Sequence, residues 1–329
     1  MPRVRRVACE RHLRDNSAMG DNAMTKPALA PREAGRFEMT TAYLMLVVAM
    51  LSWAGNVTIG RALAGWVPPF GLSLMRWSIA FVAVFPFAAR ELLTQRHVIL
   101  REWRILLALG LLGVSICNSL SYLGLQWTTA LNAALLNSAG PMLTLAASFL
   151  FFRERATPLQ IAGVTVSLVG VLVIVLRGDL AALLALSINR GDVAILVGVA
   201  SWAIYTVLLR RRPADLSPVA FLVVLFAIGV ITLLPLYAAE AALGWSLPMV
   251  PTAFLAYAFV GLFPAVIAFF GWNRGVAAIG ANRASLFTHL MPLFAAFLAY
   301  LFLGEHIAAF HLAGAALIFF GIFLANRAP

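Results

Sequence analysis

Polar and aromatic side chains recur inside stretches of this chain that are otherwise almost wholly apolar. Eight of them stand out, and they are Trp53, Asn56, Arg76, Tyr122, Asn137, Trp202, Tyr205 and His289. Polar groups are costly at membrane depth and usually face the interior of a helix bundle or a wet cavity. We therefore expect these eight residues to line a substrate cavity, where they would bind a small molecule by hydrogen bonds, ring contacts and one positive charge.

The same residue types do not form an enzyme site. His289 has no carboxylate within the apolar stretches to orient it, as a Ser/His/Asp triad would require. A phosphate-binding loop ends in Gly-Lys, and the only lysine here is Lys26. Cys9 lies in the polar N-terminal segment and Cys117 in the third apolar stretch, so no disulfide is expected. We expect no catalysis, no cofactor and no metal.

The acidic residues restrict the substrate class. All 13 Asp and Glu lie in the N-terminal segment, in loops or at the ends of apolar stretches. A cationic substrate would find no fixed negative partner, and a proton relay would depend on His289, which titrates near neutral pH when unperturbed. The pattern favours a neutral or zwitterionic substrate with an apolar or aromatic part. Movement down the gradient and weak proton coupling remain alternatives, and His289 is equally suited to hydrogen-bonded packing.

Several of these residues also have a simpler interpretation. Trp53 and Trp202 could pack helices together, while Asn56, Asn137 and Tyr205 could join helices by hydrogen bonds. Arg76 lies about eight residues, or roughly 12 Å, inside the second stretch. It could reach outward to water, pair with a backbone carbonyl, or attract a substrate carboxylate. Trp272, near the end of the eighth stretch, is expected in the aromatic belt at the membrane interface.

Composition indicates which elements position these side chains. The chain has 329 residues, of which 62% are hydrophobic and 11% charged, and its mean hydropathy is +0.93. Ten apolar stretches are long enough to cross a bilayer: 42–60, 69–89, 104–123, 129–151, 158–176, 191–209, 217–238, 251–271, 283–303 and 309–326. Backbone in lipid must satisfy its own hydrogen bonds, so these stretches predict an all-α integral membrane protein.

The chain also contains an internal repeat. Residues 49–61 read AMLSWAGNVTIGR and residues 198–210 read GVASWAIYTVLLR, with Ser-Trp-Ala and a final Arg shared at an offset of 149. Further along, Gly124, Pro141 and Glu154 return as Gly275, Pro292 and Glu305 at an offset of 151. Each copy holds five helices. A copy with an odd number of helices is inverted in the membrane, and inverted repeats are the architecture of secondary transporters.

The positive charge of the chain indicates its orientation. The net charge is +11, yet 20 of the 24 Lys and Arg lie in the N-terminal segment, in alternate loops or at Arg327, and only three lie in the intervening loops. Positive charge collects on the cytoplasmic side of membrane proteins. We expect both termini in the cytoplasm, and nucleic acid is not an expected partner.

Together these features resemble the EamA-type transporters of the drug/metabolite transporter superfamily. The resemblance covers residues 40–327 and is carried by Trp-Ala-Gly-Asn in the first helix (Trp53 to Asn56), by Arg76 after a Pro in the second, and by a Pro-bearing helix that leads through an acidic loop into a Gly-rich helix in each copy. It implies a bacterial inner-membrane exporter of amino acids, related metabolites or toxic compounds, working by alternating access. A multidrug exporter, an importer and a sensor without transport remain alternatives.

The predicted organisation follows the repeat. Residues 1–39 form a cytoplasmic, disordered tail, residues 40–176 the first five-helix repeat, 177–190 a linker loop and 191–327 the second repeat. Translation from Met24 or Met39 is an alternative for the tail. Pro141 and Pro292 are expected to kink the fourth and ninth helices. The small residues of the fifth and tenth helices favour close packing. The lipid bilayer and a small-molecule substrate are the expected partners, and the oligomeric state stays open.

Overall fold

The computed structural model describes residues 31–179, 189–303, 306 and 308–327. The chain divides into a unit of residues 1–37 and a compact unit from Glu38 to Pro329. Residues 1–30 of the predicted tail lie outside the described residues, as does Glu305, whereas residues 31–39 form the start of the first helix. Among the described residues all regular structure is helical, which confirms the predicted all-α class.

Ten helical spans in the described residues are long and apolar enough to cross a membrane. They run over Glu38–Ala62, Pro69–Thr94, Trp103–Gly124, Asn132–Phe152, Pro158–Val175, Arg190–Arg211, Pro218–Ala242, Pro251–Ile279, Ala281–Phe302 and Ala309–Asn326. Their number and order confirm the ten predicted stretches. The second and eighth spans continue past the expected ends at 89 and 271, because the helices run on into polar residues where hydropathy falls but backbone bonding does not stop.

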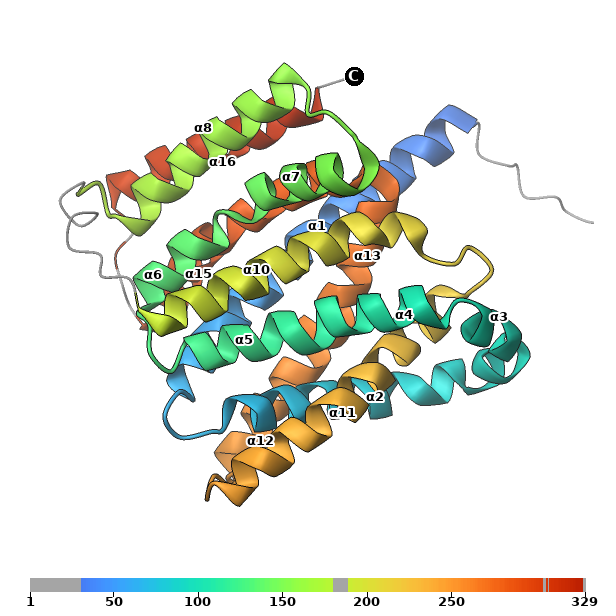
Figure 1. The fold of residues 1–329 in the computed structure, drawn as a ribbon. Helices are drawn as coiled ribbons and strands as arrows, with labels where there is room; N and C mark the ends of the chain where they lie inside the picture. Colours follow the sequence, from blue (N-terminus) through green and yellow to red (C-terminus); the bar gives the residue numbers. More distant parts are fainter. Residues whose placement is uncertain (1–30, 180–188, 304–305, 307, 328–329) are drawn as a thin grey trace, which may run out of the picture. The chain divides into compact units, whose positions relative to one another are not determined.

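The helices of the first half are shown in blue to green in Figure 1. They are α1 (Pro31–Ala62), α2 (Pro69–Thr94), α3 (Arg96–Arg101), α4 (Trp103–Gly110), α5 (Cys117–Gly124), α6 (Ala130–Asn137), α7 (Gly140–Phe152) and α8 (Pro158–Val175). Those of the second half are α10 (Arg190–Leu208), α11 (Pro218–Ala242), α12 (Pro251–Gly261), α13 (Ala268–Ile279), α14 (Ala281–Ser285), α15 (Leu290–Leu303) and α16 (Ala309–Asn326). Proline opens α2, α8, α11 and α12, a position where the missing N–H has no cost.

The helices α8 and α16 lie side by side over their length (Figure 1). A Cβ added to Gly163 would lie 2.6 Å from the Gly321 carbonyl oxygen, and one added to Gly170 would lie 2.6 Å from that of Gly314. Only glycine permits backbones to approach this closely. The predicted close packing of the fifth and tenth helices is thus confirmed.

Other helices pair in a way that follows the repeat. The helix α2 packs against α11, its equivalent in the second copy, and α10 packs against α5 as well as α6 and α7 (Figure 1). These contacts, together with that of α2 with α5, bring together four helices that carry predicted cavity residues: α2 (Arg76), α5 (Tyr122), α6 (Asn137) and α10 (Trp202 and Tyr205).

Regular helix is interrupted at equivalent points of the two copies. Leu111–Ile116 joins α4 to α5 as a π-helix, and Leu262–Ile267 joins α12 to α13 in the same way. These segments are 151 residues apart, the offset of the repeat. π-Segments inside α-helices often mark functional sites.

The fourth and ninth helices are broken just ahead of their prolines. The helix α6 ends at Asn137 and α7 starts at Gly140, so Pro141 lies in the first turn of α7. In the ninth helix a 3-10 segment, Leu286–His289, precedes α15 and Pro292. Proline has no N–H for the carbonyl four residues before it and clashes with that carbonyl, which accounts for both breaks.

Candidate functional site

A cavity with an empty volume of about 860 Å³ lies between helices of both copies. Its polar and charged lining consists of Asn56, Arg76, Cys117, Asn118, Ser121, Asn137 and Thr288. Its remaining lining consists of Trp53, Val57, Leu125, Ala133, Gly140, Ile195, Val199, Trp202, Phe269 and Met291. We call this space the central cavity.

Five of the eight predicted site residues line the central cavity: Trp53, Asn56, Arg76, Asn137 and Trp202. None of its lining residues in the described part of the chain is acidic. The cavity therefore combines aromatic walls and neutral polar groups with a single arginine.

A second cavity, with an empty volume of about 830 Å³, adjoins the first and shares Val57, Asn137, Thr288 and Met291 with it. It extends between α1, α6, α8 and α15 and is lined by His289 and Pro292. Both breaks in the helices, after Asn137 and at His289, therefore border empty space. Discontinuous helices at the substrate site are a recurring feature of secondary transporters.

Arg76 of α2 is bound by three other helical segments. It is 1% exposed, and its Nη1 donates to Asn56 Oδ1 at 3.1 Å and to the Tyr122 hydroxyl at 3.2 Å. Its Nη2 donates to the Pro264 carbonyl oxygen at 3.1 Å. Of the three interpretations offered by the sequence, reaching outward to water is excluded and pairing with a carbonyl is observed.

The π-segment of the second copy supplies that carbonyl. The Pro264 oxygen also accepts the indole N–H of Trp53 at 2.9 Å. One backbone carbonyl thus fixes both a cavity arginine and a cavity tryptophan. No sequence pattern distinguishes this oxygen, because π-helical turns leave no clear periodic signal.

Tyr122 supports the cavity without lining it. Its hydroxyl donates to Asn56 Oδ1 at 2.5 Å, so Asn56 accepts from both Tyr122 and Arg76. Tyr122 is 3% exposed. Its role in this geometry is to position Asn56 and Arg76.

Tyr205 lies in neither cavity. Its side chain is fully buried, and its hydroxyl donates to Asn273 Oδ1 at 2.7 Å. Its ring lies against Gly113, where an added Cβ would come within 2.5 Å of it. The structure thus places Tyr205 in packing between α10, the π-helix Leu111–Ile116 and α13.

Four aromatic rings form a continuous cluster at one wall of the central cavity. Trp202 packs edge-on against Trp53, with centroids 5.0 Å apart, and contacts Phe269 at 5.6 Å. Trp272 packs against both tryptophans and its indole N–H donates to Thr206 Oγ1 at 3.3 Å. The prediction that Trp272 belongs to the interfacial belt is wrong, since α13 runs on to Ile279 and leaves Trp272 fully buried.

His289 makes two hydrogen bonds. Its Nε2 lies 3.0 Å from the Ser138 carbonyl oxygen and its Nδ1 lies 2.6 Å from Ser167 Oγ. A carbonyl oxygen can only accept, so Nε2 carries the hydrogen and Nδ1 of the neutral ring accepts from Ser167. His289 thus ties the 3-10 segment Leu286–His289 to the break in the fourth helix and to α8, beside the second cavity.

The repeat explains cavity residues that sequence reasoning did not single out. Phe269 is the equivalent of Asn118, and Met291 the equivalent of Gly140, at an offset of 151. Asn137 and Thr288 are related in the same way. Projection of the predicted Asn137 through the repeat leads to Thr288. Phe269 and Met291 are apolar, and their equivalents are not among the eight predicted residues, so neither polarity nor projection gave a signal for them.

The end of the bundle that carries the arginine-rich loops, here called the basic end, is closed by polar contacts. Arg210 forms an ion pair with Glu154 at 2.6 Å, linking the ends of the sixth and fourth spans. Ser148 donates to Asn282 at 2.6 Å, and Ser217 bonds to Glu91. The central cavity has no lining residue at this end.

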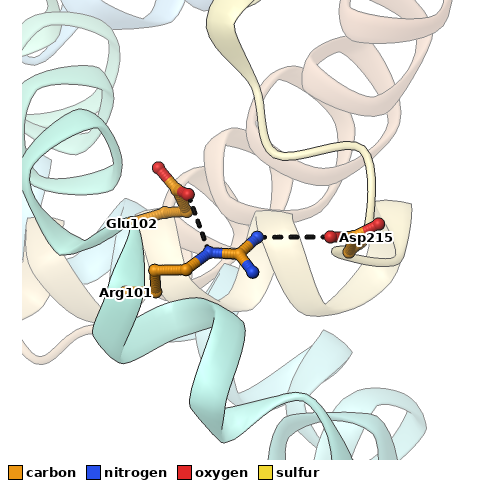
Figure 2. A network of polar contacts seen from close by, with 3 residues as sticks. All are labelled: Arg101, Glu102 and Asp215. Atoms are coloured by element: carbon orange, nitrogen blue, oxygen red, sulfur yellow. Dashed lines mark hydrogen bonds and ion pairs between the residues drawn. The ribbon is translucent and has the colours of Figure 1, made fainter.

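Figure 2 shows a separate, exposed network at the basic end. Arg101 donates to Glu102 at 2.9 Å and to Asp215 at 3.2 Å. Hydrogen bonding to Glu102 and then to Asp215 raises the pKa of the Arg101 guanidinium above its ordinary value. All three side chains are solvent-exposed, so the network contributes little to stability.

Within the described residues, no three His, Cys, Asp or Glu side chains gather as a metal site would require. The polar groups of the central cavity are amides, hydroxyls, a thiol and a guanidinium. These groups suit reversible binding.

Comparison with known proteins places this geometry in a family. The profile of the EamA-like transporter family matches residues 40–176 and again residues 189–327. The uncharacterized transporter YyaM of Bacillus subtilis is 26% identical over 86% of this chain and 93% of its own length. A protein of Streptantibioticus cattleyicolor named a probable terminal-alkyne amino-acid exporter is 29% identical over 88% of this chain and 95% of its own.

A solved crystal structure with a similar fold is found by comparison. It aligns with a TM-score of 0.70 and 20% sequence identity, over 87% of this chain and 96% of that one. At this identity the likeness concerns the fold alone.

Proposed function

Because the chain belongs to the EamA-like transporter family and is a multi-pass membrane protein, we propose that it exports small metabolites across the bacterial inner membrane. The favoured substrates are amino acids or related neutral or zwitterionic compounds. The protein works without enzymatic activity or cofactor. Two inverted five-helix repeats, residues 40–176 and 191–327 joined by a linker at 177–190, alternate access to the central cavity.

The central cavity carries this proposal. Its walls come from both copies, and pairs of equivalent residues face it: Trp53 with Trp202, and Asn137 with Thr288. A site at the interface of two repeats can be opened to either side when one repeat rocks against the other. The site therefore has the position that alternating access requires.

The lining argues for the substrate class. Trp53, Trp202 and Phe269 provide apolar ring surface, and Asn118 and Asn137 provide amide groups. Acidic side chains are lacking from the described lining, so a purely cationic drug would be desolvated without compensation. A compound with an apolar body and compact polar groups fits these walls better.

The charge distribution supports the orientation. The basic end holds Arg210 and the loops rich in arginine, which the positive-inside rule assigns to the cytoplasm. If all ten spans cross the membrane, both termini lie on this side, because an even number of crossings returns the chain to the side from which it started. In this state the Arg210–Glu154 pair closes the basic end, so export requires this contact to break when substrate enters from the cytoplasm.

The direction and cargo also draw support from a relative. The Streptantibioticus cattleyicolor protein is named an amino-acid exporter and aligns over nearly its whole length. At 29% identity its name supports the class of cargo rather than the individual compound.

An efflux assay tests the proposal. The purified full-length chain is reconstituted in liposomes loaded with the 20 standard amino acids, and release of each is measured against protein-free liposomes. We expect faster release of a small subset with apolar or aromatic side chains, and slower release in a Trp53→Ala variant. If release equals that of protein-free liposomes while drugs or other metabolites cross, the proposed cargo is wrong.

A further inference from the structure

The Arg76 guanidinium has donors that the protein leaves unused. Arginine has five N–H donors, and three are engaged by Asn56, Tyr122 and the Pro264 carbonyl. The Nε–H is buried and has no hydrogen-bond partner among the described residues. A buried donor without an acceptor is costly, so the site is incomplete as it stands.

The charge of Arg76 is also unbalanced. No ion pair among the described residues includes it, and its three acceptors are all neutral. Its ring neighbour Trp77, 4.8 Å from the guanidinium carbon, contributes only a cation–π contact. A buried charge is normally paired, which means that a counter-charge from outside the chain would stabilise this site.

The residues around Arg76 indicate which charged group would bind there and where the rest of its molecule would lie. Arg76 lines the central cavity, and Trp53 is fixed to the same Pro264 carbonyl. Guanidinium binds carboxylate through parallel N–H donors, an arrangement that a single carbonyl does not satisfy. A carboxylate beside Arg76 would place the rest of its molecule against the aromatic wall of Trp53 and Trp202.

Two further polar residues of the lining can receive the other end of such a molecule. Asn118 and Asn137 each donate their side-chain N–H groups to backbone carbonyls of their own helices. Their side-chain oxygens remain as acceptors at the cavity wall. An ammonium group needs such acceptors, which complements a carboxylate held at Arg76.

We propose that Arg76 is the carboxylate-binding residue of the central cavity, so that the substrate is a compound with a carboxylate and an apolar or aromatic body. This inference rests on the proposed function and narrows it. It excludes amines that lack a carboxylate.

The test compares each transported amino acid with its own carboxamide, which removes the carboxylate charge and keeps the side chain. In liposomes holding the full-length chain, competition by both compounds is measured for the wild type and for Arg76→Gln. We expect the wild type to prefer the acid by roughly ten- to a hundredfold, the usual effect of a hydrogen bond to a charged group. In Arg76→Gln this preference should fall to about threefold or less.

A second variant covers the case in which Arg76→Gln does not fold. Asn56→Asp keeps the shape of the side chain and places a carboxylate against Arg76 Nη1. It should pair with the guanidinium and remove the preference for the acid. Arg101→Gln is the matched control, since its guanidinium is exposed at the basic end and far from the cavity lining.

Each outcome decides between the claims. If the wild type transports no amino acid, the proposed function fails and this inference with it. If the wild type transports an amino acid but takes the carboxamide equally well, or if Arg76→Gln and Asn56→Asp keep the wild-type preference, the inference is overturned and the proposed function stands. Loss of the preference in either variant, with Arg101→Gln unchanged, supports Arg76 as the carboxylate-binding residue.

Discussion

The two copies of the repeat place an asparagine–tyrosine pair at the same two positions, with the residues exchanged. In the first copy Asn56 accepts from Tyr122. In the second copy Tyr205, at the position of Asn56, donates to Asn273, at the position of Tyr122. We call these the first and second polar pairs.

Their surroundings differ. The first polar pair holds Arg76 and borders the central cavity through Asn56. At the position of Arg76 the second copy has Leu225, which is fully buried in the hydrophobic core. The same hydrogen bond therefore positions a charged group in one copy and only joins helices in the other. This division suggests that duplication supplied the scaffold and that substitution in one copy made the binding site.

The largest effect is expected from a charge placed in the second copy. Leu225→Arg would bury a guanidinium without the acceptors that Arg76 has, at a cost of roughly 3 kcal/mol or more. We expect little or no monodisperse protein in detergent extracts analysed by fluorescence-detected size exclusion. Leu225→Met is the control and should behave as wild type. A normal yield of Leu225→Arg would show that the surroundings of Leu225 are not a packed apolar core.

The next comparison, between Asn56→Ala and Asn273→Ala, distinguishes a role in substrate binding from a role in helix packing. Asn56→Ala and Asn273→Ala each leave a buried tyrosine hydroxyl without its acceptor, and each should destabilise the protein by ~1–3 kcal/mol. Only Asn56→Ala also loosens Arg76, so only this variant should raise KM, by about tenfold. Equal KM values for the two variants in proteoliposome transport would remove the functional distinction between the polar pairs.

A smaller effect compares the two tyrosine hydroxyls. In Tyr122→Phe the Asn56 oxygen keeps Arg76 as a donor, but Arg76 Nη1 loses the Tyr122 hydroxyl as an acceptor. Tyr205→Phe removes only the one donor recorded for the Asn273 oxygen. An unpaired buried group costs more when it is charged, so Tyr122→Phe should lower the free energy of unfolding by more than the ~1–3 kcal/mol expected of Tyr205→Phe. Unfolding curves of both purified variants provide the comparison. A larger loss in Tyr205→Phe would mean that Arg76 does not depend on Tyr122 as an acceptor.

The smallest effect concerns arginines at equivalent helix ends. Arg210 pairs with Glu154 at the basic end, while its equivalent Arg61 donates to the Leu125 carbonyl oxygen at 2.8 Å. The pair with Glu154 is partly exposed, and such pairs contribute up to ~1 kcal/mol. Arg210→Gln should change the transport rate by no more than about fivefold, through easier opening of the basic end. Arg101→Gln, in the network of Figure 2, should leave it unchanged. Equal rates in the two variants would argue against Arg210 as a closing contact.

Much of the fold could be predicted from the sequence because it follows from hydropathy. The ten spans needed only length and apolar composition, and the breaks before Pro141 and Pro292 follow from the missing N–H of proline. The extension of the eighth helix could not be predicted, because Asn273 and Arg274 lower the hydropathy of residues that remain helical. The position of Trp272 was mistaken for this reason.

The site was less accessible to sequence reasoning. Polarity identified Asn56 and Tyr205 equally, yet only Asn56 reaches the central cavity. The difference depends on how each helix is rotated and on what each π-segment contacts. Gly113, in the first π-segment, packs against the Tyr205 ring, whereas the carbonyl of Pro264, in the second, accepts a hydrogen bond from Arg76. Neither the direction of a backbone carbonyl nor the rotation of a helix can be read from the identity of a residue.

Labelling of Cys117 tests the central claim most directly, because this thiol lines the central cavity beside Asn118. In a Cys9→Ser background the rate of N-ethylmaleimide labelling would be measured with and without a saturating concentration of a transported amino acid, in the wild-type site and in Arg76→Gln. We expect the amino acid to slow labelling severalfold in the wild-type site and to give little protection in Arg76→Gln at the same concentration. Transport of the amino acid with no protection of Cys117 would contradict the assignment of the central cavity as the substrate site.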